Sequence, residues 1–352
     1  MKKILALLLA LCMLAALGAC GTQTPDASTE ASTEASTDAT TEASTEATTE
    51  TTAPEAVPAT YSVVALKGPT GMGLASLMDK AAKGETANTY NFTLAGDPTA
   101  VSASVIKGEV DVACVPVNLA SVLYTKTNGE YVCAAVNTLG VLHVLENGDS
   151  VQSIADLAGK TVYSTGLGST PEYILNYILE KNGLSDKVTV EYKTEHSELA
   201  ALLASGDVKL GILPEPNVTS AMMQNGDLRL ALDLTAEWDK VSDTSAVQGC
   251  VIVKKAAVEA NPAAFADFLT DYAESVAFVN ENVEDAAAFC ETYGIVPKAA
   301  VAVRAYPNCN IVFVTGADMK ASLSAFLGVL YDANPASVGG AMPADDFYYG
   351  AD

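Results

Sequence analysis

From about residue 61 onward, short apolar runs typical of buried strands alternate with longer segments that carry an apolar stripe at helical spacing. In the segment 162–179, an apolar start leads into a glycine-rich stretch, after which Ile174 and Ile178 recur four residues apart. Ser169 and Glu172 form an S-x-x-E capping box, with a proline between them. This order predicts a strand, a glycine loop and a capped helix. Free backbone N–H groups in such a loop can hold an anion or a ligand carbonyl.

The same two patterns continue along the chain. Strands are expected at 62–66, 91–94, 110–115, 131–136, 161–163, 188–192, 208–213, 228–232 and 248–254. Helices are expected at 73–82, 98–107, 262–279, 283–293 and 317–331. Alternating strands and helices predict an α/β protein with mainly parallel sheets flanked by helices.

The strand and glycine loop have a second copy 98 residues earlier, where Gly68 takes the place of Gly166. The match continues, because 106–116 repeats the order of apolar, glycine and proline positions in 204–214. Two copies do not make a solenoid, which needs three or more. They predict two similar lobes facing each other across a cleft, a common place for a ligand.

The lobes are expected to be joined by two crossings of the chain. An apolar run at 139–146 is interpreted as a strand that leads from the first lobe into the second, and 248–254 as the return strand. A hinge is therefore expected at about 144–147 and 248–251. The predicted boundaries are 61–152 with 246–352 for the first lobe, and 153–245 for the second.

The N-terminal residues are expected to be targeting signals and not part of the folded domain. Residues 1–19 combine two lysines with an apolar run, which is typical of a secretory signal peptide. The sequence L-G-A-C ending at Cys20 resembles the bacterial lipobox, which implies cleavage before Cys20 and palmitate-type lipidation of its thiol. The alternative is a transmembrane anchor, but an apolar run of about 16 residues is short for a span.

Residues 20–60 form the predicted link between that anchor and the lobes. After Cys20 they repeat A-S-T-E and A-T-T-E, with eight acidic residues and no basic one. Such a composition cannot bury a core, so we expect a disordered acidic tether.

Charge excludes one class of partner. The chain has a formal net charge of −24, and residues 61–352 hold 35 acidic and 17 basic side chains. Nucleic acid is not expected as a partner, because phosphate neutralisation needs clustered Lys and Arg. A small anionic ligand stays possible, since a few oriented N–H groups can hold one.

Cysteine usage argues against disulfides and zinc. Cys12 leaves with the signal peptide and Cys20 is expected to be lipidated, so an odd number remains, without C-x-x-C spacing. Core thiols are the favoured interpretation, because free cysteine behaves as a small hydrophobe. The remaining cysteines are Cys114, Cys133, Cys250, Cys290 and Cys309.

Catalytic motifs are not found. Residues 68–73 lack the G-K-[ST] that completes a nucleotide-binding P-loop, and Pro171 takes the third glycine position of a dinucleotide motif that starts at Gly166. His143 and His196 are interpreted as structural, and there is no G-x-S-x-G and no metal-ligand cluster. We therefore expect neither enzyme activity nor a cofactor.

Several segments resemble a known family. I-A-D-L-A-G-K at 154–160 is common among solute-binding proteins of the type II periplasmic-binding-protein fold, and it marks the fold without naming a ligand. Narrower similarity points to the group that binds sulfonates, taurine, nitrate or the pyrimidine precursor of thiamine. Those segments are 65–73, 168–173, 213–216 and 337–340. The resemblance covers everything after residue 60.

The resemblance implies a two-lobed receptor that delivers a small molecule to an ABC permease. It implies a monomer, lipid-anchored on the extracytoplasmic face of a bacterial membrane, with a sulfonate, nitrate or pyrimidine-like ligand. Two alternatives stay open: a ligand sensor that docks on a membrane kinase, and an enzyme like those that make the thiamine pyrimidine. The enzyme would need histidines in the cleft.

By position, the family's ligand contacts fall on both glycine loops and on the turns after two strands. These positions are Gly68, Pro69, Thr70, Gly71, Met72, Asn118, Ser164, Thr165, Gly168, Ser169, Thr170 and Glu215. Structural roles are open for the same residues: the glycines can serve tight turns, Asn118 and Thr170 can cap helices, and Glu215 can face a helix dipole.

Overall fold

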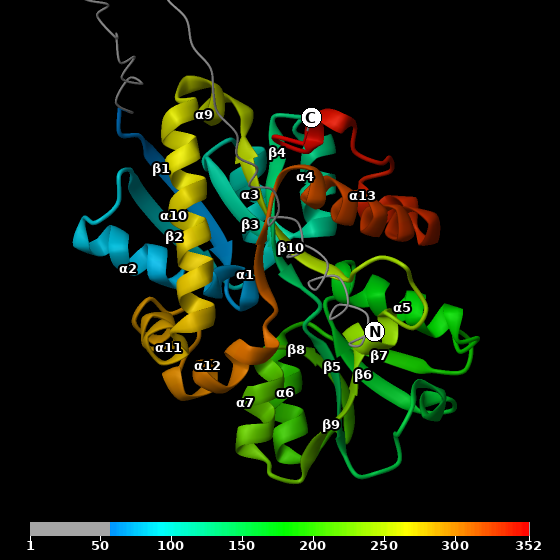
Figure 1. Cartoon of the computed structure of the whole chain (residues 1–352). Helices are drawn as coiled ribbons and strands as arrows, with labels where there is room; N and C mark the ends of the chain where they lie inside the picture. The colour runs from blue at the N-terminus through cyan, green and yellow to red at the C-terminus, as the bar shows by residue number, and fades with distance from the viewer. Residues whose placement is uncertain (1–56, 352) are drawn as a thin grey trace, which may run out of the picture. The chain divides into compact units, whose positions relative to one another are not determined.

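Two β-sheets organise residues 57–351, the part of the chain that this computed structural model describes (Figure 1). The larger sheet has the order β11-β4-β10-β3-β1-β2 and the smaller one β7-β6-β8-β5-β9. The strands of the larger sheet are β1 (Thr60–Leu66), β2 (Thr89–Ala95), β3 (Val112–Pro116), β4 (Tyr131–Leu139), β10 (Val247–Lys254) and β11 (Ile311–Val314). The strands of the smaller sheet are β5 (Leu142–Asn147), β6 (Thr161–Thr165), β7 (Thr189–Lys193), β8 (Leu210–Pro214) and β9 (Leu228–Asp233).

Strand directions confirm the predicted fold class. In the larger sheet only β10 and β11 run against the other strands, and in the smaller sheet only β5 does. Both sheets are therefore mainly parallel, and helices pack around them (Figure 1). We call the larger sheet and its helices the first lobe, and the smaller sheet and its helices the second lobe.

Helices of the first lobe come from both ends of the described chain. They are α1 (Pro69–Met72), α2 (Ala75–Lys83), α3 (Pro98–Ile106), α4 (Val117–Lys126), α9 (Lys255–Ala260), α10 (Pro262–Glu281), α11 (Val283–Thr292), α12 (Ala299–Ala305) and α13 (Gly316–Ala333). Helices of the second lobe are α5 (Thr170–Lys181), α6 (His196–Ser205), α7 (Asn217–Gln224) and α8 (Leu234–Trp238). The chain thus begins and ends its described part in the first lobe.

The strand predicted at 139–146 is wrong in one respect, because the chain breaks it at Gly140. A Cβ on Gly140 would lie 2.1 Å from Thr235 Oγ1, so only glycine allows this close approach. β4 ends at Leu139, and β5 starts at Leu142 in the other sheet. Apolar periodicity does not mark this break, since apolar residues, Leu139 and Val141, stand on both sides of it.

The two crossings consequently lie elsewhere than predicted. β5 pairs with β8 and β9 along its length, so the first crossing is at residues 140–141 and the second lobe starts before 153. β10 pairs with β3 and β4, which places the return crossing at 239–246. The hinge positions expected at 144–147 and 248–251 are inside the sheets.

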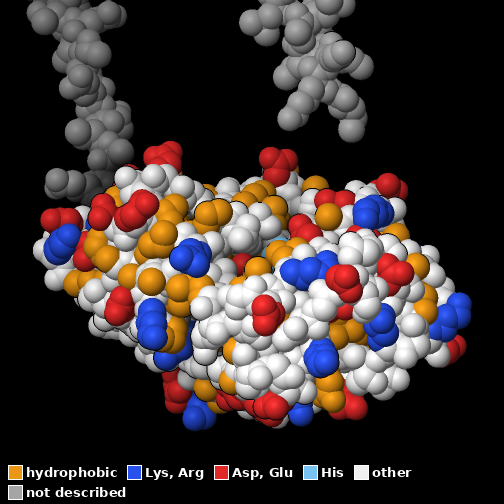
Figure 2. Space-filling model, turned by 90° about the horizontal axis from the view of Figure 1, so that it is seen from below, with side chains coloured by type: hydrophobic (Ala, Val, Ile, Leu, Met, Phe, Trp, Pro, Cys, Tyr) orange, Lys and Arg blue, Asp and Glu red, His pale blue; other side chains and the backbone are white. Residues whose placement is uncertain are grey.

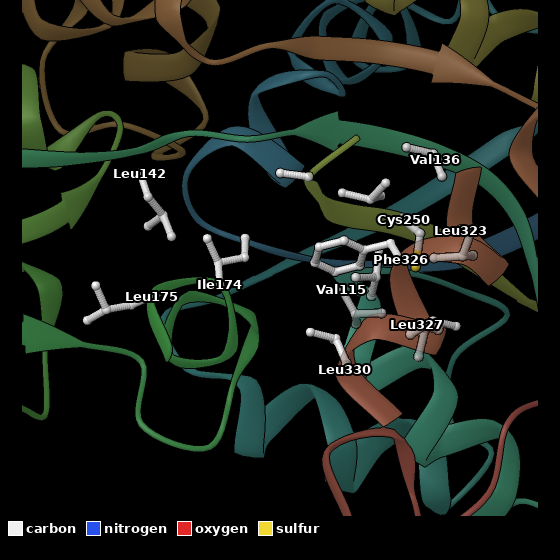
Figure 3. Close-up of a cluster of buried hydrophobic side chains, with 14 of the residues drawn as sticks. Val115, Val136, Leu142, Ile174, Leu175, Cys250, Leu323, Phe326, Leu327 and Leu330 are labelled. Carbon is white, nitrogen blue, oxygen red and sulfur yellow. The ribbon is translucent and has the colours of Figure 1, made fainter. Parts of the chain in front are cut away.

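One apolar cluster joins the two lobes. Ile174 of α5 and Leu142 of β5 belong to the same buried cluster as Phe326 of α13 (Figure 3). Trp238 of α8 is fully buried there, with its ring centroid 4.6 Å from that of Tyr177 and 5.2 Å from that of Phe326. Truncating such a side chain to alanine typically costs about 3–5 kcal/mol, so this contact contributes strongly to the fold.

The five cysteines of the described residues are all buried and free, which confirms their interpretation as core thiols. Burial raises the pKa of the Cys114 thiol to about 12. Between residues 57 and 351, no helix has the length and apolar character needed to cross a membrane. The calls on the lipobox, Cys20 and the acidic tether fall on residues outside the described part.

Surface charge is mixed. On the face shown in Figure 2, basic side chains are scattered among acidic ones and do not form a continuous band over the described residues.

Candidate functional site

A cleft of about 650 Å³ lies between the two lobes and is lined from both of them. Its walls follow the carboxyl ends of β1, β2, β6, β7 and β8, where ligands of parallel α/β sheets commonly bind. The lining residues used below are Lys67, Gly68, Pro69, Thr70, Asp97, Val141, Gly166, Leu167, Gly168, Ser169, Pro171, Lys193, Glu195, His196, Pro214, Glu215 and Gln248.

The first glycine loop reaches the cleft only in part. Gly68, Pro69 and Thr70 line it, whereas Gly71 and Met72 are buried behind them and do not. A Cβ on Gly71 would lie 2.6 Å from the carbonyl oxygen of Leu66. Gly71 therefore serves close packing, and the structure does not bring it or Met72 to the candidate site.

The second glycine loop lines the cleft with Gly168 and Ser169, but the predicted capping box does not form. Ser169 Oγ donates to the Gly166 carbonyl at 2.7 Å instead of capping the helix. The Glu172 carboxylate accepts from Gly168 N–H at 2.5 Å. The Ser169 N–H donates to the Gly166 carbonyl at 3.0 Å. Because the turn and Glu172 use these two N–H groups, the expectation that they are free for a ligand is wrong.

Three other predicted residues of the second loop lie behind the cleft surface. Ser164, Thr165 and Thr170 are almost fully buried and do not line it. Thr165 still acts on the site, since its Oγ1 lies 2.7 Å from Nδ1 of His196, which does line the cleft.

Asn118 and Thr170 join the lobes rather than cap helices. Thr170 Oγ1 in the second lobe donates to Asn118 Oδ1 in the first lobe at 2.9 Å. Neither residue is the N-cap of its helix, which is Pro116 for α4 and Ser169 for α5. Asn118 is buried and does not line the cleft, so its predicted ligand contact is replaced by this interlobe hydrogen bond.

Glu215 lies in the cleft as predicted. It follows β8, is 1% exposed, and accepts hydrogen bonds from Thr219 N–H at 3.1 Å and Thr219 Oγ1 at 3.0 Å. Burial raises the pKa of its carboxyl, although the Thr219 bonds work in the opposite direction. Glu215 therefore has both roles: it lines the cleft, and it accepts hydrogen bonds from Thr219 in the first turn of α7.

Other polar residues of the cleft were not predicted. His196 is half-buried and desolvation lowers its pKa to about 4, which keeps the imidazole neutral at pH 7. Gln248 is 9% exposed, and its Nε2 has no hydrogen-bond partner among residues 57–351. The rule that sites follow the carboxyl ends of strands could have drawn attention to Asp97 and to 193–196. Gln248, at the start of a return strand, carries no such signal.

The family model described as "NMT1/THI5 like" matches residues 91–286. A search of curated proteins finds no match. The chain is also similar to solved structures, at identities that bear on the fold alone.

Three of these structures cover most of the chain. An ABC transporter protein from Parabacteroides distasonis is 22% identical, with a TM-score of 0.69, over 82% of this chain and 98% of that one. The periplasmic aliphatic sulphonate-binding protein SsuA of Escherichia coli is 19% identical, with a TM-score of 0.65, over 84% and 93%. The alkanesulfonate-binding protein SsuA of Xanthomonas axonopodis pv. citri, bound to MOPS, is 14% identical, with a TM-score of 0.62, over 82% and 96%.

Proposed function

The chain belongs to the NMT1/THI5-like family, and on that premise we propose that it is an extracytoplasmic solute-binding lipoprotein of an ABC importer. The observation that carries this proposal is the cleft of about 650 Å³ lined from both lobes. A volume of this order suits a small molecule. The similar structures that bind sulfonates have the same fold, which supports capture of a small solute.

The proposed contacts combine the two glycine loops with the strand ends. Gly68, Pro69 and Thr70 approach the ligand from the first lobe, and Gly168, Ser169 and Glu215 from the second. Because contacts come from both lobes, closure would strengthen binding and present one shape to a permease. The crossings at 140–141 and 239–246 are the places where such a motion would bend the chain.

Capture without catalysis is the favoured function over the enzyme alternative. His196 is the histidine that lines the cleft, and its Nδ1 is already engaged with Thr165, while His143 does not line it. Of the two histidines, only His196 is therefore available in the described part of the cleft to an enzyme that needs histidines there. No observation favours the kinase-docking sensor over the importer.

The test of solute capture is mass spectrometry of small molecules released when the purified protein is denatured. We expect one dominant compound in a near-stoichiometric amount, unchanged in mass after incubation with fresh protein. A compound converted to another mass would support the enzyme instead. Two results together would contradict the proposed function: an extract without any bound small molecule, and uptake of small solutes by the cells that does not change when the gene is deleted.

The lipid anchor is a separate proposal with its own test. Cells expressing the full chain with a labelled fatty acid should label the protein, and Cys20→Ser should abolish that label because the acceptor thiol is lost. Cys12→Ser is the matched control and should leave labelling unchanged. A labelled Cys20→Ser protein would contradict anchoring at this residue.

A further inference from the structure

The floor of the cleft carries a hydrogen-bonding pattern that restricts the ligand. Building on the proposed function, we infer that the solute is neutral or cationic, presents an N–H donor to Glu215 and an acceptor to Gln248, and is not an oxyanion such as a sulfonate or nitrate. Glu215 is a carboxyl acceptor, and the amide nitrogen of Gln248 is a donor. Both residues line the cleft.

These two side chains come from different strands but lie beside the same crossing. The Glu215 N–H donates to the carbonyl of Val141 at 3.0 Å. Gln248 stands between two residues of β10 that pair with β4: Val247 opposite Leu139, and Gly249 opposite Thr138. The backbones of both residues thus lie beside the crossing at 140–141, and both residues line the cleft.

Both groups keep hydrogen-bonding capacity for a ligand. The Glu215 carboxylate receives two hydrogen bonds from Thr219 and has the Asn308 side chain as a further hydrogen-bonding neighbour, whereas two carboxylate oxygens offer about four acceptor positions. Gln248 Nε2 is buried and lacks a partner within residues 57–351. A buried polar group without a partner is costly, so a ligand acceptor at this nitrogen would recover that cost.

Two helix N-termini that could hold an oxyanion are already used by carboxylates of the protein. Asp97 accepts from Thr99 N–H at 2.6 Å at the start of α3, and Glu172 accepts from Gly168 N–H before α5. At these two of the helix N-termini next to the cleft, those of α3 and α5, a carboxylate of the chain itself therefore takes the place of a bound anion. No arginine is among the residues that line the cleft.

The other charged side chains of the cleft do not give it an excess of positive charge that would attract an oxyanion. The lining contains two lysines, Lys67 and Lys193, and three carboxyl side chains, those of Asp97, Glu195 and Glu215. When the buried Glu215 carboxyl is ionised, an oxyanion near it would meet repulsion that water screens poorly. An N–H donor would instead gain a charge-assisted hydrogen bond there.

Apolar lining residues complete the description of the ligand. Leu167 at the tip of the second loop is 66% exposed, and Pro69, Pro171 and Pro214 line the same cleft. The solute is thus expected to combine an apolar body with one polar edge that carries donor and acceptor.

The extraction experiment on the full chain also tests this inference, because accurate mass gives the elemental formula. We expect a nitrogen-containing compound without a sulfonate group. In parallel, thermal melting with 5 mM ethanesulfonate, nitrate, cytosine or acetamidine compares oxyanions with N–H donors. We expect a rise in Tm with at least one N–H donor and none with either oxyanion.

Two variants assign the effect to the floor of the cleft. Glu215→Gln and Gln248→Leu should each weaken binding of the recovered compound or of the active probe by at least about tenfold, as expected for a lost hydrogen bond to a buried group. Glu198→Gln is the matched control, an exposed carboxyl on α6 outside the lining, and should leave affinity unchanged. Thermal melting without ligand shows whether each variant folds. If Glu215→Gln does not fold, Gln248→Leu still tests the inference.

The outcomes separate this inference from the proposed function. Recovery of a sulfonate or of nitrate would overturn the inference while solute capture stands. The same holds if Tm rises with ethanesulfonate, if no N–H donor raises it, or if both floor variants bind as tightly as the unchanged protein. An empty extract with no response to any probe would overturn solute capture itself.

Discussion

The two glycine loops share a sequence pattern but differ in packing. The loop after β1 turns at once into the core: Met72 is fully buried, and Gly71 lies against the Leu66 carbonyl. The loop after β6 stays at the surface of the cleft, with Leu167 66% exposed and open space around Gly168. A repeated motif therefore predicts a repeated backbone path, whereas its environment decides whether it supports the fold or faces the ligand.

The largest difference should appear when the same substitution is made in both loops. Gly71→Ala places a Cβ 2.6 Å from backbone oxygen, which a short buried helix cannot relieve by moving a side chain. We expect the free energy of unfolding to fall by about 3 kcal/mol. Gly226→Ala is the control, since a Cβ there meets nothing within 4 Å. Urea unfolding of both variants measures this, and equal stability would contradict the packing role.

The hydrogen bond between the lobes gives the next effect. Thr170→Val keeps the side-chain shape but leaves the buried Asn118 Oδ1 without the donor that lies 2.9 Å away. We expect a loss of about 2 kcal/mol, typical of a buried acceptor without a partner. The exposed Thr189→Val should change stability by less than about 0.5 kcal/mol. If the two variants melted alike, Thr170 would not hold the lobes together.

At the second loop, Gly168→Ala should cost less than the matching change at Gly71. Space is available for the Cβ, but the φ of +76° belongs to the left-handed region. That conformation costs a non-glycine residue about 1–2 kcal/mol. Because Gly168 lines the cleft, affinity for the recovered solute should fall as well, which calorimetric titration would show. If Gly168→Ala lowered the free energy of unfolding more than Gly71→Ala does, the proposed difference between the two loops would be wrong.

The smallest effect is a pH dependence that comes from His196, which contacts Thr165 at the end of β6. Burial lowers the pKa of His196 to about 4, below the usual value of 6.5, so the unfolded chain binds more protons between these values. Stability should therefore fall as pH drops from 7 to 5, by about 1 kcal/mol once partial exposure is allowed for. His196→Asn should reduce the slope of Tm against pH, and the remainder is expected from His143, whose pKa burial also lowers. His143 stays in both proteins, so a slope that is unchanged would exclude His196 as its source.

Much of the fold is readable from the sequence, because the apolar periods of strands and helices are local. The strands expected at 62–66 and 228–232 and the helix expected at 262–279 match β1, β9 and α10 to within a few residues. The echo of Gly68 and Gly166 correctly indicates two related lobes with glycine loops at the cleft. The pattern of β11 is not recognisable, since four residues are too few to show a period.

The tertiary structure decides what depends on residues far apart in the sequence. Gly140 breaks an apolar run because Thr235 packs against it, and Thr170 bonds to Asn118 instead of capping its helix. The Nε2 donor of Gln248 is identified only once residues 57–351 are known to offer it no acceptor. The sequence by itself determines where strands, helices and loops form, because these follow from neighbouring residues. Which polar groups remain for a ligand depends on partners that only the folded chain brings together.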